Sequence, residues 1–201
     1  MRKLIKRTAK SAAEIPTLFF EEQKAWERWL AKNHKSSAGV WMRFAKKDSG
    51  LRSVTYKQVL EIALCYGWID GQKRSESDTT WLQKFVPRGS RSMWSKINRE
   101  AAAALIECGR MNPAGLAAVE RAKQDGRWAA AYDGQKKATV PDDLQAALDK
   151  NAKASAFFVT LDSKNRYAVL FRVHTAKKRE TRARRIEQFV AMLARHEKLH
   201  P

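Results

Sequence analysis

Alternating hydrophobic and polar residues in the first half of the chain predict both helices and strands. Residues 21–33 place apolar side chains three and four positions apart among charges, which is typical of an amphipathic helix. Val40–Ala45 alternates as a strand does, and Thr55–Tyr66 begins with a capping-box pattern that predicts a second helix. Trp68–Arg74 and Thr80–Val86, joined by a polar turn, are expected to pair as antiparallel strands. We therefore predict an α+β fold with a small antiparallel sheet and packed helices.

Two more helices are expected before the pattern changes near residue 127. Apolar residues recur at helical spacing from Ser92 to Cys108. Asn112 followed by Pro113 is a typical helix start, and Gly126 is expected to end that helix. Residues 127–139 are polar and lack a periodic pattern, so we interpret them as a linker.

The remaining sequence predicts a helical module. A helix start at Pro141 and apolar stripes that include Tyr167 and Ile186 indicate a C-terminal three-helix module. The predicted layout is a flexible basic arm (1–15), an α+β main domain (16–126), the linker (127–139) and the helical module (140–201).

The chain is strongly basic, with 40 Lys and Arg against 21 Asp and Glu and a formal net charge of +19. Such a charge attracts anions, so nucleic acid, acidic proteins and anionic lipid are candidate partners; the alternative is a solvated basic surface that only aids solubility. No apolar run long enough for an export signal or a membrane span follows the basic N-terminal segment. We therefore expect a cytoplasmic protein without membrane insertion, in which Cys65 and Cys108 are reduced core residues.

Several sequence blocks together resemble the bacterial YdeI/OmpD-associated family, often labelled bacteriocin-protection proteins. These blocks are GVWMRFAKK at Gly39–Lys47, ALCYGWIDG at Ala63–Gly71, FVPR at Phe85–Arg88, MWSKIN at Met93–Asn98, GRMNPAG at Gly109–Gly115, VPDDL at Val140–Leu144 and ETRARRI at Glu180–Ile186. The resemblance covers nearly the whole chain from about residue 17. It implies an intracellular bacterial protein linked to tolerance of bacteriocins or cationic antimicrobial peptides, and it supplies no catalytic residues to transfer.

One motif is typical of zinc hydrolases. His196-Glu197-Lys198-Leu199-His200 matches the pattern in which two histidines one helical turn apart bind zinc. The match lies at the end of the sequence, where we expect a frayed helix and neither a third ligand nor a cleft. No Gly-rich phosphate loop or catalytic triad spacing accompanies it. We therefore expect no catalytic residue, cofactor or metal, and favour a non-enzymatic protein.

A second group of residues has the chemistry of a small-ligand pocket. Aromatic walls, an acid, a base and an amide are expected near one end of the sheet. The group consists of Trp68, Asp70, Arg88, Trp94, Ser95 and Asn98. We favour the alternative that the tryptophans are core residues and that Asp70 pairs with Arg88 or a backbone amide.

A third group is a candidate anion-binding surface within the basic stretch from Lys164 to Arg185. Lys178, Arg182 and Arg185 fall on one helical face and are candidates for phosphate contacts. The alternative is a solvated face that partly pairs with acidic residues.

Three functions follow from these observations. The leading hypothesis is a non-enzymatic protein of bacteriocin or antimicrobial-peptide tolerance, which acts by binding. The second is a nucleic-acid-associated protein that uses the N-terminal arm and the Lys164–Arg185 surface. The third is a small-ligand binder or enzyme that uses the candidate pocket with Trp68, Asp70, Arg88 and Asn98. A protein of charge +19 repels cationic peptides, so an anionic ligand fits the first hypothesis better than direct peptide capture.

Overall fold

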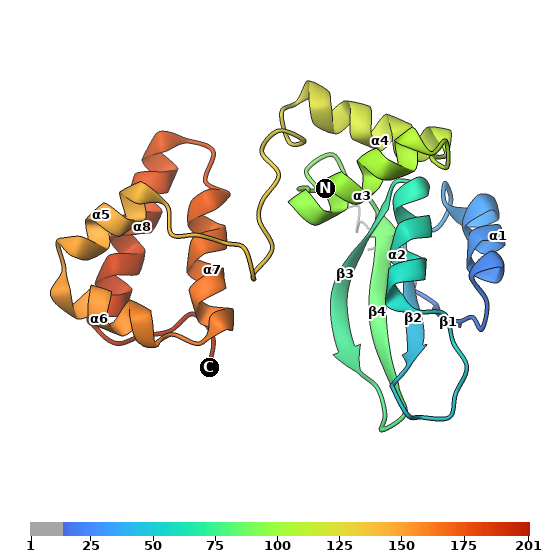
Figure 1. Cartoon of the computed structure of the whole chain (residues 1–201), viewed down its shortest axis with the longest axis horizontal. Helices are drawn as coiled ribbons and strands as arrows, with labels where there is room; N and C mark the ends of the chain where they lie inside the picture. The colour runs from blue at the N-terminus through green and yellow to red at the C-terminus, as the bar shows by residue number, and fades with distance from the viewer. Residues whose placement is uncertain (1–13) are drawn as a thin grey trace, which may run out of the picture. The chain divides into compact units, whose positions relative to one another are not determined.

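The computed structural model describes residues 14–201 and confirms the α+β fold class (Figure 1). The predicted basic arm lies outside the described residues except for its last two positions. Two compact units are distinguished. Residues through Ser92 together with Ala102–Arg121 form unit 1, and Met93–Ala101 together with Ala122–Pro201 form unit 2. The predicted domain boundaries stay a prediction, and each unit is described by itself.

Unit 1 contains a four-stranded sheet in the order β1-β2-β4-β3. The strands are β1 (Thr17–Phe19), β2 (Val40–Ala45), β3 (Trp68–Ser75) and β4 (Thr80–Pro87). The three longer strands pair antiparallel at the predicted positions. β1 is an edge strand that sequence analysis missed, and it pairs parallel to β2. Three residues are too few for a period of two to be recognised.

Two helices and the sheet share the core of unit 1. They are α1 (Gln23–Asn33) and α2 (Tyr56–Cys65), which lies in front of the sheet in Figure 1. Alternate residues of β2 point into this core, because strand side chains alternate between faces. The predicted capping box forms: Thr55 and Gln58 each accept a hydrogen bond from the other's backbone N–H. The buried Trp26 donates its indole N–H to the Val59 carbonyl and thereby connects α1 to α2.

Helices α3 (Lys96–Glu107) and α4 (Pro113–Gln124) follow the sheet. Within unit 1, the chain at the start of α4 meets the end of α2: the Asn112 N–H donates to the Cys65 carbonyl at 3.0 Å. A Cβ atom on Gly115 would lie 2.2 Å from that same carbonyl oxygen. Glycine therefore permits the first turn of α4 to approach α2 this closely.

The C-terminal module has four helices where sequence analysis expected three. They are α5 (Asp142–Asp149), α6 (Ala152–Thr160), α7 (Ser163–His174) and α8 (Arg179–Ala194). The missed helix is α6, whose apolar run at 156–159 covers more than one face and therefore lacks a stripe of period 3.6. Asn151 caps α6 by accepting the Ala154 N–H. In the part of the chain that the structure describes, no helix is both long and apolar enough to cross a membrane.

Candidate anion-binding site at the end of the sheet

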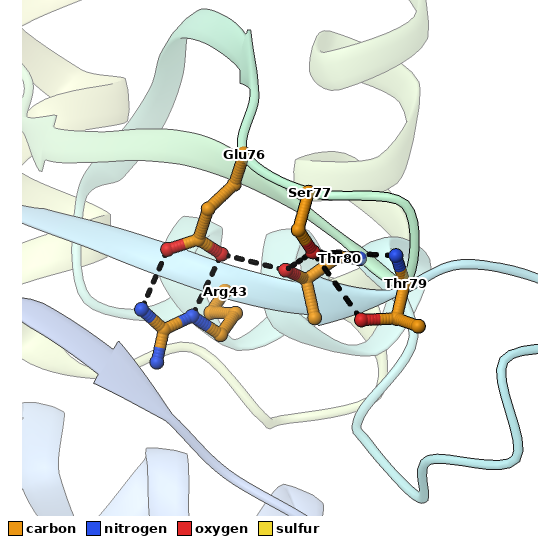
Figure 2. A network of polar contacts seen from close by, with 5 residues as sticks. All are labelled: Arg43, Glu76, Ser77, Thr79 and Thr80. Carbon is orange, nitrogen blue, oxygen red and sulfur yellow. Dashed lines mark hydrogen bonds and ion pairs between the residues drawn. The ribbon is translucent and has the colours of Figure 1, made fainter.

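A polar network fixes the turn between β3 and β4 (Figure 2). Arg43 of β2 donates two hydrogen bonds to the Glu76 carboxylate, at 2.7 and 2.5 Å. The Thr80 hydroxyl donates to the same carboxylate at 2.8 Å, and the Ser77 hydroxyl oxygen accepts the Thr79 and Thr80 backbone N–H groups. The Arg43 guanidinium lowers the pKa of Glu76 because its hydrogen bonds stabilise the ionised carboxylate. The turn is thus tied to the middle of the sheet.

Beside this turn, four cationic residues and one tryptophan line a common pocket. Lys46 and Lys47 follow β2, Lys73 and Arg74 belong to β3, and Trp81 belongs to β4. These five residues, here named the basic rim, line a shallow pocket of about 420 Å³ with Ala45 and Ser75. The lining contains no carboxylate. The register of the sheet places them together, since Ser75 lies opposite Trp81 and Ala45 opposite Thr80.

Two cation–aromatic contacts come from consecutive residues of β3. The Lys73 ammonium lies 4.4 Å from the centroid of Trp81, and the Arg74 guanidinium lies 4.2 Å from that of Trp41. Trp81 in turn stacks on the buried Phe44, with centroids 4.6 Å apart. Consecutive strand residues point to opposite faces, so one cation–aromatic pair lies on each face of this edge strand. Both aromatic rings are held in place by packing.

The positive charge of the basic rim is not compensated. Within residues 14–201, none of its four cations forms an ion pair. Glu76, which follows β3 directly, is engaged by Arg43. Uncompensated cations grouped around a pocket raise the local positive potential and attract anions. Sequence analysis missed this site. The available signal was two pairs of cations, one directly after the predicted strand that contains Trp41 and one in the strand that precedes the Trp81 strand.

The predicted small-ligand group is divided between the two units. In unit 1, the buried Trp68 donates its indole N–H to the His34 carbonyl, the Asp70 carboxylate accepts the Tyr56 hydroxyl at 2.8 Å, and the Arg88 backbone N–H donates to the Gly67 carbonyl. Each contact connects secondary-structure elements of the core. Sequence analysis expected Asp70 to pair with Arg88 or a backbone amide; in the structure its carboxylate accepts a hydrogen bond from Tyr56.

The other three members of that group lie in unit 2. Trp94 is buried and packs edge to face against Trp128, with centroids 4.9 Å apart. Ser95 accepts the Asn98 N–H through its hydroxyl oxygen and so caps the start of α3. These are structural contacts, and the pocket itself stays a prediction.

The predicted anion surface on α8 is largely engaged in contacts within unit 2. Arg182 makes two hydrogen bonds to Asp143 of α5, at 2.5 and 2.7 Å, and a third to the Val173 carbonyl of α7. Arg185 donates to the Arg172 carbonyl near the end of α7. Lys178 is exposed at the position before α8. The two arginines thus donate to backbone carbonyls in the last turn of α7, of which the Val173 carbonyl also accepts the Ala176 N–H.

The segment that resembles a zinc motif does not form the required helical turn. α8 ends at Ala194, and His196 has a positive φ of 60°. The His196 ring stacks on Phe157 and Glu197 pairs with Arg195. The His200 backbone N–H donates to the buried Asn165. No group of three or more potential metal ligands occurs among residues 14–201.

Cys65 is buried as expected, whereas the same expectation for Cys108 is wrong. Cys108 lies directly after α3 and is exposed, because it follows the last buried residue of that helix, Leu105, by three positions. Both thiols are free. Burial raises the pKa of Cys65 to about 11.

Two known families match different parts of the chain. Residues 18–118 match the family described as "Domain of unknown function (DUF8412)", and residues 137–196 match the one described as "Bacteriocin-protection, YdeI or OmpD-Associated". No curated protein and no solved structure matches the chain. The resemblance to the YdeI/OmpD-associated family is confirmed, over the C-terminal helices. Since the first match spans half of its length, the chain belongs to the DUF8412 family, and it carries a YdeI/OmpD-associated, bacteriocin-protection domain at its C-terminal end.

Proposed function

We propose that the chain is a cytoplasmic, non-enzymatic protein that supports bacteriocin tolerance by binding an anionic partner at the basic rim. The association with bacteriocin protection is supported by the family match at residues 137–196. The binding mode is supported by one observation above all: four cationic residues that form no ion pair with the described residues line one pocket together with Trp81.

The sign of the charge decides which partner is bound. Bacteriocins and antimicrobial peptides that are cationic are repelled by a surface of net charge +19. An anionic partner is attracted by the same field, and attraction is strongest where cations border a pocket. The protein therefore acts on a target inside the cell and does not capture the peptide.

Survival under bacteriocin challenge tests this function. A bacterial strain that lacks the gene is complemented with the wild type, with a rim variant, or with a control variant of equal charge change. The rim variant carries Lys46→Gln, Lys47→Gln, Lys73→Gln and Arg74→Gln. The control variant carries Lys24→Gln, Arg28→Gln, Lys32→Gln and Lys35→Gln, four exposed residues in or next to α1.

The proposal expects the wild type and the control variant to restore survival equally and the rim variant to fail at the same protein level. Equal survival with the rim variant refutes a role for the basic rim. Equal loss with both variants means that only the total charge matters.

A further inference from the structure

Resting on the proposed function, we propose that the anionic partner is single-stranded nucleic acid, with phosphates on the rim lysines and bases stacked on the aromatic and guanidinium planes. The basic rim offers both kinds of contact on neighbouring residues. Lys46 and Lys47 are point charges suited to phosphates. The Arg74 guanidinium is a planar group suited to a base. Trp81, which stacks on Phe44, offers a ring face to a base once the Lys73 ammonium, 4.4 Å from its centroid, moves to a phosphate.

Arg74 is prepared for stacking by its contact with Trp41. Its guanidinium already lies on the indole at 4.2 Å, while the residue as a whole is exposed. A guanidinium held against an aromatic ring loses less side-chain freedom when a base stacks on its other face. Arg43 does not compete for this role, because Glu76 holds it with two hydrogen bonds.

The same geometry favours single strands over a duplex. Bases in a duplex are stacked on each other and expose only groove edges and phosphates, whereas single strands expose base faces. The basic rim lies at a sheet end beside a hairpin turn, and no helix belongs to it that would enter a major groove. A polyanion without bases can pair only with the lysines, whereas a nucleic acid can also stack its bases. Stacking therefore distinguishes nucleic acid from other polyanions.

Fluorescence anisotropy with the full chain tests the proposal. The probes are a labelled oligothymidylate of about ten nucleotides, an abasic strand of the same length and a duplex, each across a salt series. The expected order of affinity is oligothymidylate above abasic strand and duplex, by about five-fold or more at equal salt. The rim variant is expected to lower the slope of log affinity against log salt by about 2 for the oligothymidylate, since the phosphate contacts of three lysines are lost. The control variant at Lys24, Arg28, Lys32 and Lys35 retains the wild-type slope.

Arg74→Lys separates stacking from charge, because lysine keeps the charge and loses the plane. This variant is expected to weaken binding of the oligothymidylate about three- to ten-fold and to leave binding of the abasic strand unchanged. Arg74 is exposed, so an unchanged thermal unfolding curve accompanies the effect.

Equal affinity for oligothymidylate and abasic strand, with no effect of Arg74→Lys, overturns the inference and leaves a general polyanion site. Absence of binding to any strand also overturns it, while the proposed function stands if survival still depends on the basic rim. The opposite result is also possible. If oligothymidylate binding depends on the basic rim but survival under bacteriocin does not, the inference holds and the proposed function fails.

Discussion

Arg43 and Glu76 form a two-pronged ion pair that joins β2 to the turn after β3, with N–O distances of 2.5 and 2.7 Å. The pair has two consequences. It holds the hairpin turn against the sheet, and it removes one carboxylate from the electrostatic balance beside the basic rim. Stability and anion binding should therefore respond in opposite directions when the pair is broken.

Glu76→Gln is expected to destabilise the protein by about 1 kcal/mol, since a partly exposed ion pair contributes little more. The same change releases the Arg43 charge and should strengthen oligonucleotide binding about two- to five-fold at low salt. Urea unfolding and anisotropy measure the two effects. Glu21→Gln, at an exposed residue outside the rim, is the control with the same charge change. Equal gains in affinity from both variants would show that Glu76 has no local effect.

The approach of α4 to α2 predicts a large difference between two glycines. Gly115→Ala places a methyl group against the Cys65 carbonyl and should cost about 2 to 3 kcal/mol, because the helix must move away. A methyl group at Gly109 would meet no atom within 4 Å, so only the φ of 70° disfavours alanine there. Gly109→Ala should therefore destabilise the protein by about 1 kcal/mol. Denaturant unfolding of both variants measures the difference. Similar losses would mean that the contact at Gly115 relaxes without cost.

The sequence predicts those elements whose apolar residues face one core. The stripe of α1 and the alternation of β2 are examples, because one buried face imposes one period. The periodic pattern does not reveal β1, which is too short, or α6, which is apolar on more than one face. The basic rim was missed for another reason: it depends on register, which brings Lys46, just after β2, and Lys73 of β3 to one pocket with Trp81 of β4. The helical face of Arg182 and Arg185 was recognised, but their partners on α5 and α7 are set by tertiary packing.

The two cysteines should differ in their reactivity toward a thiol reagent. With a pKa of about 11, only about one in a thousand Cys65 side chains is a thiolate at pH 8, and burial also blocks access. The exposed Cys108 should react first, and Cys65 only at the rate of unfolding. Ellman's reagent measures one fast and one slow thiol, and Cys108→Ser should remove the fast one. Two fast thiols would contradict the burial of Cys65.

Arg182 should act mainly on the stability of the helical module. It bonds Asp143 of α5 and the Val173 carbonyl of α7, so Arg182→Ala removes contacts to two helices at once. Asp143 is half exposed, which weakens the ion pair, and the expected loss is about 1 to 2 kcal/mol. Arg184→Ala, at an exposed position of the same helix, is the control and should be nearly neutral.

The dependence of this loss on pH follows from Asp143. The guanidinium of Arg182 lowers the pKa of Asp143, so the ion pair stabilises the fold above the ordinary carboxyl pKa and is lost as pH falls through the lowered value. The gap in unfolding free energy between wild type and Asp143→Asn should therefore be largest near pH 7 and shrink toward pH 3. Urea unfolding across this range measures it, and a constant gap would exclude the ion pair as its cause.

If Arg182→Ala instead reduced oligonucleotide binding as strongly as the rim variant, without loss of stability, the binding surface would lie on α8 and not at the end of the sheet.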